Sequence, residues 1–225
     1  MVTSRIQNEI VQYIKRNRVS TTEVADCLGK SGALPGVSAV NQGCFAVGRV
    51  RYVYGHSSSN WSIHEQIREV QRGEVVVVDG IEVGDRALIG ELVVKFLVLY
   101  KMAAAVVVPG FVRDANDLLK NRYPVWCRGF SPMGCFNTRQ PESEVVRKQV
   151  AERKKLYENS IAVCDDTGVV IIPGSCHDRE FLKKLHLIEQ QEDIWFNCID
   201  FRKWDTFDTV CLKKYLKTKK PLGGK

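Results

Sequence analysis

The sequence lacks several features that would assign it to a class at once. No stretch approaches the ~18–20 uninterrupted apolar residues that cross a membrane, and residues 1–18 carry charges where a signal peptide has its apolar core. The eight cysteines contain no Cys-x-x-Cys pair and no nearby histidine at a zinc-binding spacing. We therefore expect a cytoplasmic protein with reduced thiols and no contact with membranes.

What is present is an ordinary globular composition with an uneven charge. The chain has 225 residues, of which 44% are hydrophobic and 26% charged, which is typical of one folded domain. Its net charge of +7 is concentrated in residues 201–225, with eight basic and two acidic side chains, and in residues 138–157, with six and three. A nucleic-acid groove needs positive charge spread along it, so we expect a solvated tail and no nucleic acid.

Hydrophobic periodicity predicts helices and strands that alternate along the chain. The continuous β-branched runs 75–78 and 105–108 are typical of buried parallel strands, and a helix between them completes a βαβ unit. We predict helices over residues 4–17, 21–30, 62–70, 87–105, 115–120, 141–158, 178–193 and 206–216, strands over 44–54, 75–78, 105–108 and 124–127, and a hairpin of 160–163 with 169–172.

These elements predict a single-domain α/β/α sandwich with a mostly parallel central sheet. We assign residues 1–200 to the domain, with an N-terminal helix in 1–19 and a charged helical insertion at 138–158. Residues 201–225 are expected to form a C-terminal helix and a basic tail.

Ligands of open α/β sheets bind at the carboxyl ends of the strands, and two loops at such ends are candidates for a binding site. Residues 79–91 end in Gly90-Glu91-Leu92 near a helix start, where free backbone N–H groups and the helix dipole favour an anion such as a carboxylate. Glycine lets such a ligand come close to the backbone.

The second loop, residues 109–114, places Arg113 beside Asp114 just after a strand. Arginine can hold a 2-oxo carboxylate by two parallel hydrogen bonds, and aspartate is an oxygen ligand for Mg²⁺ or Mn²⁺. The ion would polarise the ketone of such a substrate. A structural salt bridge or a helix cap explains the same pair, and the residues alone leave both interpretations open.

A series of short motifs in a fixed order resembles the RraA-like family over residues 20–195. The motifs are TEVADCL (22–28), LPG (34–36), Gly48, NWSIH (60–64), GEVVVVDG (73–80), ALIGEL (87–92), GFVRD (110–114), YPVWCRG (123–129), SP (131–132) and DDTGVVIIP (165–173). The resemblance implies the RraA-like, swivelling-domain-like version of the predicted fold.

The resemblance also implies roles for individual residues. In the aldolases of the family, the residues matching Arg113 and Asp114 bind pyruvate and the divalent metal. The loop matching Gly90, Glu91, Leu92 and Val93 supplies amides to the pyruvate carboxylate, and Glu91 and Arg113 are the implied catalytic residues. The implied substrate-binding residues also include Asn60 and His64, and Glu189 and Glu192 of a neighbouring subunit are candidates for completing the metal site. Both glutamates could equally be solvent-facing charges.

The implied activity is that of a divalent-metal-dependent lyase. It would cleave a 4-hydroxy-2-oxo acid to pyruvate, decarboxylate oxaloacetate, or both, through a metal-stabilised enolate. The alternatives are a non-enzymatic regulator that binds a ribonuclease, and an enzyme with a different small carboxylate or sugar-acid substrate. A methyltransferase gains no support, because no glycine-rich loop for an adenosyl cofactor is present. The family implies a homotrimer or homohexamer with sites between subunits.

The sequence departs from the aldolase pattern at four points. The interval between Glu91 and Arg113 has 21 residues, one more than in the aldolases, so the helix between them is expected to bulge or to rotate Glu91 by about 100°. Pro109 replaces a common Asp, Asn137 replaces a Lys that meets the distal carboxylate of the substrate, and the charged residues 138–157 replace a shorter apolar stretch. These changes indicate a different substrate or lost activity.

Overall fold

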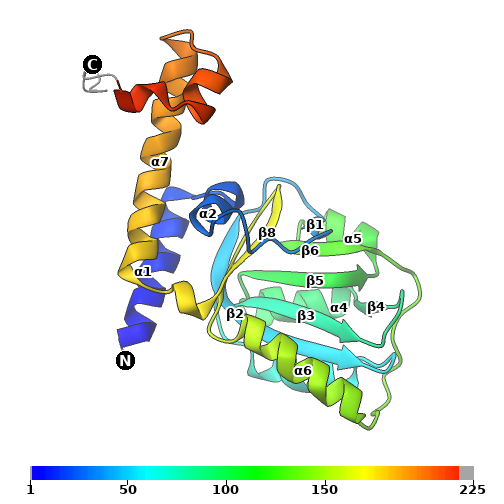
Figure 1. Cartoon of the computed structure of the whole chain (residues 1–225). Coiled ribbons are helices and arrows are strands. Elements are labelled where there is room, and N and C mark those ends of the chain that lie inside the picture. Colours follow the sequence, from blue (N-terminus) through cyan, green and yellow to red (C-terminus); the bar gives the residue numbers. More distant parts are fainter. Residues whose placement is uncertain (1, 218–225) are drawn as a thin grey trace.

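The computed structural model describes residues 2–217, and the side chains of residues 5–217. Its centre is an eight-stranded sheet in the order β1-β6-β5-β3-β2-β7-β8, with β4 paired to β5 (Figure 1). The strands are β1 (Ser38–Ala39), β2 (Ala46–His56), β3 (Val75–Ile81), β4 (Ala87–Ile89), β5 (Ala105–Val112), β6 (Val125–Phe130), β7 (Ile161–Asp165) and β8 (Gly168–Ile172).

The sheet is mostly parallel, as predicted, and it is nearly closed. Strands β6, β5, β3 and β2 run parallel, whereas β1, β7 and β8 pair antiparallel with their neighbours. The segment before β1 joins the two ends of the sheet, because Leu34 N–H donates to the Val169 carbonyl in β8 at 2.9 Å while Ser38 pairs with Cys127 in β6. The β7–β8 hairpin confirms the predicted one.

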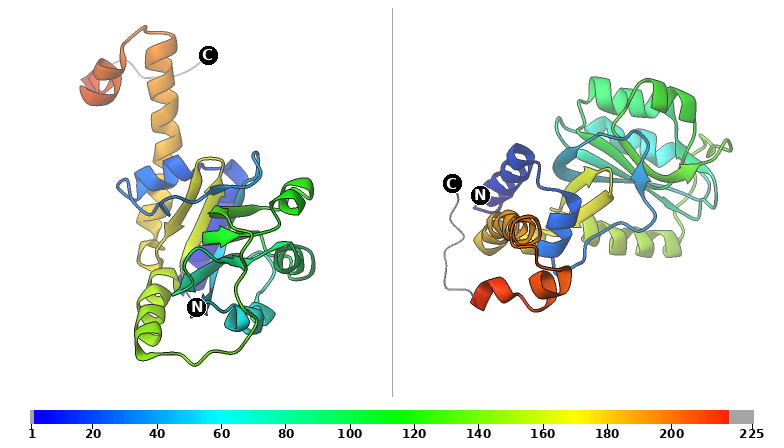
Figure 2. Two further views of the ribbon diagram at one scale, coloured as in Figure 1. Left: turned by 90° about the vertical axis from the view of Figure 1, so that its right-hand side faces the viewer. Right: turned by 90° about the horizontal axis from the view of Figure 1, so that it is seen from above.

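Helices cover both faces of the sheet. They are α1 (Val2–Asn17), α2 (Thr21–Cys27), α3 (Trp61–Gln66), α4 (Glu91–Lys95), α5 (Ala115–Lys120), α6 (Glu144–Tyr157) and α7 (Arg179–Asp200), with the short turns η1 (Ile67–Glu69), η2 (Phe96–Tyr100), η3 (Gly174–Cys176), η4 (Phe207–Cys211) and η5 (Lys214–Lys217). Figure 2 shows α4 and α5 on one face and α6 on the other. The predicted α/β/α sandwich is confirmed.

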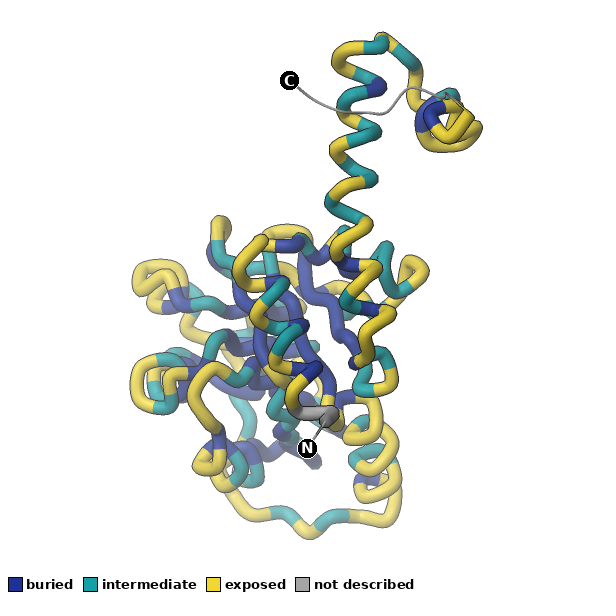
Figure 3. Tube along the Cα trace, turned by 90° about the vertical axis from the view of Figure 1, so that its left-hand side faces the viewer, coloured by how far each residue is buried: buried dark blue, intermediate teal, exposed yellow. Residues whose placement is uncertain are grey.

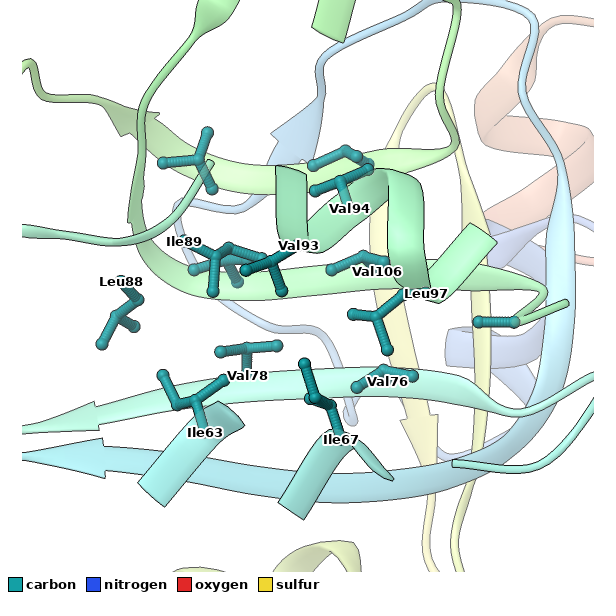
Figure 4. Close-up of a cluster of buried hydrophobic side chains, with 14 of the residues drawn as sticks. Ile63, Ile67, Val76, Val78, Leu88, Ile89, Val93, Val94, Leu97 and Val106 are labelled. Carbon is teal, nitrogen blue, oxygen red and sulfur yellow. The ribbon is translucent and has the colours of Figure 1, made fainter. Parts of the chain in front are cut away.

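The alternation of side chains along the strands builds the two halves of the core. Val76 and Val78 of β3 pack with Ile63, Val94 and Leu97 on one face, as Figure 4 shows. On the other face, apolar side chains of β3, β5 and β6 pack near Tyr157 of α6. A third cluster joins α1, α2 and the start of α7 to β7 and β8.

The last elements of the described chain leave this core. The second half of α7, with η4 and η5, stands clear of the sheet and forms what we call the C-terminal arm, residues 190–217 (Figures 1 and 3). Within the arm, α7 and η5 contact each other, because Trp195 Nε1–H donates to the Tyr215 hydroxyl at 3.3 Å. It nevertheless exposes large apolar side chains, among them Phe196, Phe201 and Leu216.

Several predicted elements need correction. The helix expected over 87–105 was wrong at both ends: residues 87–89 form β4, because Ala87 and Ile89 pair with β5, and the helical turns end at Tyr100. The helix expected over 206–216 is broken into η4 and η5. Helix α7 runs seven residues beyond the predicted end at 193, and α2 ends at Cys27, short of 30. The predicted tail residues 219–225 lie outside the described residues.

The charged segment predicted as an insertion is a structural helix. Arg153 of α6 binds both carboxylate oxygens of Asp79, which is 2% exposed, at 2.6 and 2.8 Å. Asp79 also accepts a hydrogen bond from the Tyr52 hydroxyl at 3.1 Å. Part of the positive charge of residues 138–157 therefore serves to hold α6 against the sheet through this ion pair. Across residues 2–217, no helix is long and apolar enough to span a membrane.

Candidate functional site

Most of the residues predicted for the site, although not Glu91, Glu189 or Glu192, line one small cavity at the carboxyl ends of β4 and β5. Its volume is about 80 Å³. The lining includes seven of the residues predicted to bind substrate or metal, namely Asn60, His64, Gly90, Leu92, Val93, Arg113 and Asp114. It also includes Asn137, where the sequence departs from the aldolases, and Gly134 and Cys135 just before it. These residues come from four separate segments of the chain, so the fold and not sequence proximity brings them together.

Strand β4 fixes the two central loops against each other. Ile89 pairs with Val112, and the Arg113 N–H donates to the Ile89 carbonyl at 3.0 Å. Gly90 follows at once and lies so close to the second loop that an added Cβ would stand 2.2 Å from Asp114 Oδ2 and 2.8 Å from Arg113 Cγ. Any larger residue at 90 would displace the pair, so glycine is required here for close approach.

Asp114 is held in an uncommon backbone conformation. Its φ of 62° and ψ of 42° are left-handed, a region that a non-glycine residue occupies only at a cost in free energy. The Glu91 N–H donates to Asp114 Oδ2 at 3.0 Å, which ties the carboxylate to the first turn of α4. The Asp114 side chain makes no capping hydrogen bond to α5, but by accepting the Glu91 N–H it caps the first turn of α4, so the predicted helix-cap alternative is compatible with this geometry.

Arg113 keeps most of its hydrogen-bonding capacity. Its side chain is 54% exposed, and its one ion pair in the described part of the chain is with Asp114, at 3.7 Å from Nε. Gly134 makes room for the guanidinium, because a Cβ at 134 would stand 2.8 Å from Nη1. The terminal nitrogens can therefore bind an anion that enters the cavity.

Asn60 presents an unusual buried oxygen. Its Nδ2 donates to the Leu88 carbonyl at 3.1 Å, whereas Oδ1 is buried and has no hydrogen-bond partner within the described residues. A buried acceptor without a partner costs free energy and is most often explained by a water, an ion or a ligand. Asn60 lines the cavity, so a water molecule or a polar group of a ligand bound there could donate a hydrogen bond to this oxygen.

The donor set fits a hydrated divalent cation. Asp114 is the single carboxylate that lines the cavity, and residues 2–217 hold no group of three or more His, Cys, Asp or Glu side chains placed for a metal. Mg²⁺ in proteins commonly takes one or two carboxylates and keeps several waters. Asp114, with the unpartnered Asn60 oxygen as an acceptor for metal-bound water, meets that requirement.

The extra residue between Glu91 and Arg113 is absorbed as a bulge. Residues Phe96–Tyr100 form a π-helical turn directly after α4, which is how a helix accommodates one inserted residue. Of the two outcomes expected from the spacing, the bulge is the one observed.

The carboxylate of Glu91 does not reach the cavity in this conformation. The Tyr123 hydroxyl donates to Glu91 Oε1 at 3.4 Å, on the side of α5 and β6. Burial raises the pKa of Tyr123, and the neighbouring Glu91 carboxylate raises it further. The backbone of Glu91 belongs to the site, and its side chain points to the helix packing behind it.

Glu189 and Glu192 lie on α7, at the opposite end of the domain from the cavity (Figure 1). Glu189 accepts a hydrogen bond from the Tyr13 hydroxyl at 2.6 Å. Burial raises the pKa of Glu192, and the nearby carboxylates of Glu23 and Asp26 add to that rise. Within one chain neither glutamate meets Asp114, so only another copy could bring them to the site.

The sequence matches the model of a known protein family. A family described as "RraA-like: Aldolase/RraA" matches residues 21–171, well over half of the chain. The chain belongs to the RraA-like family. The resemblance predicted from the short motifs is thereby confirmed.

Curated relatives match at low identity. "Protein DlpA" of Legionella pneumophila is 24% identical over 177 residues, which are 74% of this chain and 28% of that protein. The "Putative 4-hydroxy-4-methyl-2-oxoglutarate aldolase" of Halalkalibacterium halodurans is 27% identical over 124 residues, 55% of this chain and 59% of that protein. The chain therefore spans less than two thirds of either relative.

Solved structures support the fold. An uncharacterized protein from Pseudomonas syringae superposes with a TM-score of 0.69 at 21% identity, covering 92% of this chain and 94% of that one. RraAS2 of Streptomyces coelicolor, described as an unusual member of the RNase ES inhibitor RraA protein family, gives 0.63 at 23% identity, covering 82% and 94%. At these identities the likeness shows the fold alone.

Proposed function

We propose that this chain is a divalent-metal-dependent lyase that releases pyruvate from a 4-hydroxy-2-oxo acid or decarboxylates oxaloacetate. The observation that carries the proposal is the convergence of Arg113, Asp114 and the backbone at Gly90 on one cavity that also holds the unpartnered oxygen of Asn60. A structural salt bridge alone would not need two glycines to make room for Arg113 or a strained backbone at Asp114.

Each residue has a definable task in this reaction. Arg113 binds the carboxylate of the substrate by two parallel hydrogen bonds, and the N–H groups of Leu92 and Val93, in the first turn of α4, donate to the same group. Asp114 would hold Mg²⁺ or Mn²⁺. When bound, that ion supplies Lewis-acid polarisation of the 2-oxo group, which stabilises the enolate formed as the bond breaks.

The proton and electron balance follows from these positions. A base removes the 4-hydroxyl proton, the C3–C4 bond breaks, its electron pair passes toward C3 and the 2-oxo oxygen, and C3 then takes up a proton to give pyruvate. In oxaloacetate the same bond breaks and releases CO₂. We assign the base to Glu91 acting through water, which requires its carboxylate to turn from the Tyr123 hydroxyl toward the cavity, and we place His64 at the cavity wall beside the substrate.

We further propose that the active form is a homo-oligomer, a trimer or hexamer, in which Glu189 or Glu192 of another copy completes the site. The exposed apolar side chains of the C-terminal arm support an assembly, because contiguous apolar surface of this kind marks interaction sites. The distance of both glutamates from their own cavity is consistent with this arrangement.

The first test is pyruvate release from 4-hydroxy-4-methyl-2-oxoglutarate and from oxaloacetate, with Mg²⁺ and with a chelator. Native protein should turn over with metal only, and Arg113→Ala should lose about 10²- to 10³-fold, because a preorganised charged donor is removed. Arg72→Ala, an exposed arginine in a distant turn, is the matched control. Mixed subunits of Arg113→Ala and Glu192→Gln should regain part of the activity if the site is shared.

Two results would contradict the proposal. One is an absence of turnover with oxaloacetate and with every 4-hydroxy-2-oxo acid tested, under all metal conditions. The other is an Arg113→Ala protein as active as the native one.

A further inference from the structure

Helix α3 has two faces with different tasks. Ile63, with Ile67 in the following turn, packs into the core beneath the helix (Figure 4). The opposite face carries Trp61, His64, Glu65 and Arg68, which helical spacing places side by side. Trp61 is 40% exposed, so part of its ring is available to a ligand.

This exposed face lines a second hollow next to the Arg113 cavity. The hollow has a volume of about 340 Å³ and is lined by Trp61, His64, Glu65, Arg68 and Asn137. His64 and Asn137 also line the cavity of Arg113, so they form the wall common to both spaces. A ligand too long for the smaller cavity would continue past these two residues.

The chemistry of the second hollow suits an uncharged chain that bears hydroxyl groups. Glu65 and Arg68 carry opposite charges that sum to zero, and no ion pair joins them in the part of the chain that the structure describes. Each can therefore hydrogen-bond a hydroxyl, as can the Asn137 amide, which donates and accepts. The Trp61 ring offers a flat apolar surface for C–H groups.

A distal carboxylate fits the same space less well. Arg68 could pair with it, but the Glu65 carboxylate in the same hollow would repel it, and Asn137 offers it a neutral amide in place of a charge-assisted hydrogen bond. The charge balance and the exposed tryptophan together favour a polyhydroxylated tail.

We propose that the substrate is a 2-oxo-3-deoxy sugar acid, whose 2-oxo acid head binds at Arg113 and whose hydroxylated tail lies against Trp61 between Glu65 and Arg68. This inference rests on the proposed lyase function and specifies its substrate class. Trp61 and Glu65 are then specificity-determining residues that contact the tail alone.

The test uses acids that lack the 4-hydroxyl and so cannot undergo retro-aldol cleavage. Isothermal titration in Mg²⁺ compares pyruvate, 2-oxoadipate and 5,6-dihydroxy-2-oxohexanoate. The native protein should bind the dihydroxy acid about 10-fold more tightly than either of the others, a difference within the range of one aromatic contact and its hydrogen bonds. Trp61→Ala and Glu65→Gln should abolish this preference and leave pyruvate binding unchanged.

The outcomes separate the two proposals. Equal or tighter binding of 2-oxoadipate, or a Trp61→Ala effect that is the same on pyruvate, overturns the tail assignment while the lyase function stands. The expected preference without pyruvate release from 4,5,6-trihydroxy-2-oxohexanoate supports the tail site and contradicts the lyase function. A failure of all three acids to bind overturns both.

Discussion

Two of the hollows in the described part of the chain differ in almost every respect. The cavity at Arg113 measures about 80 Å³ and is enclosed by strained or closely packed backbone. The groove between α2, β8 and the start of α7 measures about 670 Å³ and is lined mainly by apolar and small side chains, among them Leu28, Leu34 and Phe181. Volume favours the groove as a binding site, and chemistry favours the cavity. The convergence of polar groups, and not volume, is therefore our reason for preferring the cavity as the candidate site.

The largest expected effect on activity comes from a substitution that disrupts the small cavity at Arg113. Gly90→Ala places a methyl group 2.2 Å from Asp114 Oδ2, so both loops must shift, and displacements of about 1 Å cost on the order of 10²-fold in rate. We expect pyruvate release to fall by that factor. Gly110→Ala, where the added Cβ would meet nothing closer than 3.5 Å, should stay within about two-fold of native. Equal losses in both variants would refute the close-approach argument.

The next effect concerns α6, whose C-terminal residues Leu156 and Tyr157 form one wall of the groove. Arg153→Leu leaves the buried Asp79 carboxylate without its cation and should lower the free energy of unfolding by about 3 kcal/mol, measured by urea denaturation. Lys148→Leu on the same helix should change it by less than about 0.5 kcal/mol. The Asp79→Asn, Arg153→Leu double variant should recover part of the loss. If Arg153→Leu left the free energy of unfolding unchanged, the ion pair with Asp79 would not stabilise the packing of α6 against the sheet.

The smallest effect is a pH dependence at the foot of α7, beside the groove. His177 is 6% exposed and its Nδ1 has no partner among residues 5–217, so burial lowers its pKa, with Arg49 adding to the effect. The unfolded chain takes up this proton near pH 6.5 and the folded chain resists it, so stability should be full above that pH and should fall on acidification. His177→Gln should flatten the slope of unfolding free energy between pH 8 and 5.5, whereas His64→Gln at the surface should not. An unchanged slope would disprove the assignment.

Much of the parallel core could be predicted because its signals are local. The β-branched runs 75–78 and 105–108 are buried strands, and the order of short motifs identified the loops that carry Gly90, Arg113 and Asp114. Strand β4 was missed because Ala87-Leu88-Ile89 is equally compatible with a helix, and only pairing with β5 decides between the two.

Other features depend on contacts far apart in sequence. Gly134 makes room for Arg113 across 21 positions, and Arg153 pairs with Asp79 across 74. The π turn at Phe96–Tyr100 was one of two outcomes that the spacing allowed, and the packing of Leu97 into the core is consistent with the bulge. The role of Glu91 as base stays a prediction, since its carboxylate hydrogen-bonds Tyr123 in this conformation.

The nearly closed sheet has one more consequence, for how the protein can meet its neighbours. Residues 32–34 occupy the outer rim of β8 and residues 38–40 occupy the outer rim of β6, so the backbone groups that would template a foreign strand are already satisfied. Association by strand addition is thereby blocked at both rims. Contacts with other copies or partners would then use side chains, and the C-terminal arm exposes several large apolar ones, among them Phe196, Phe201 and Leu216.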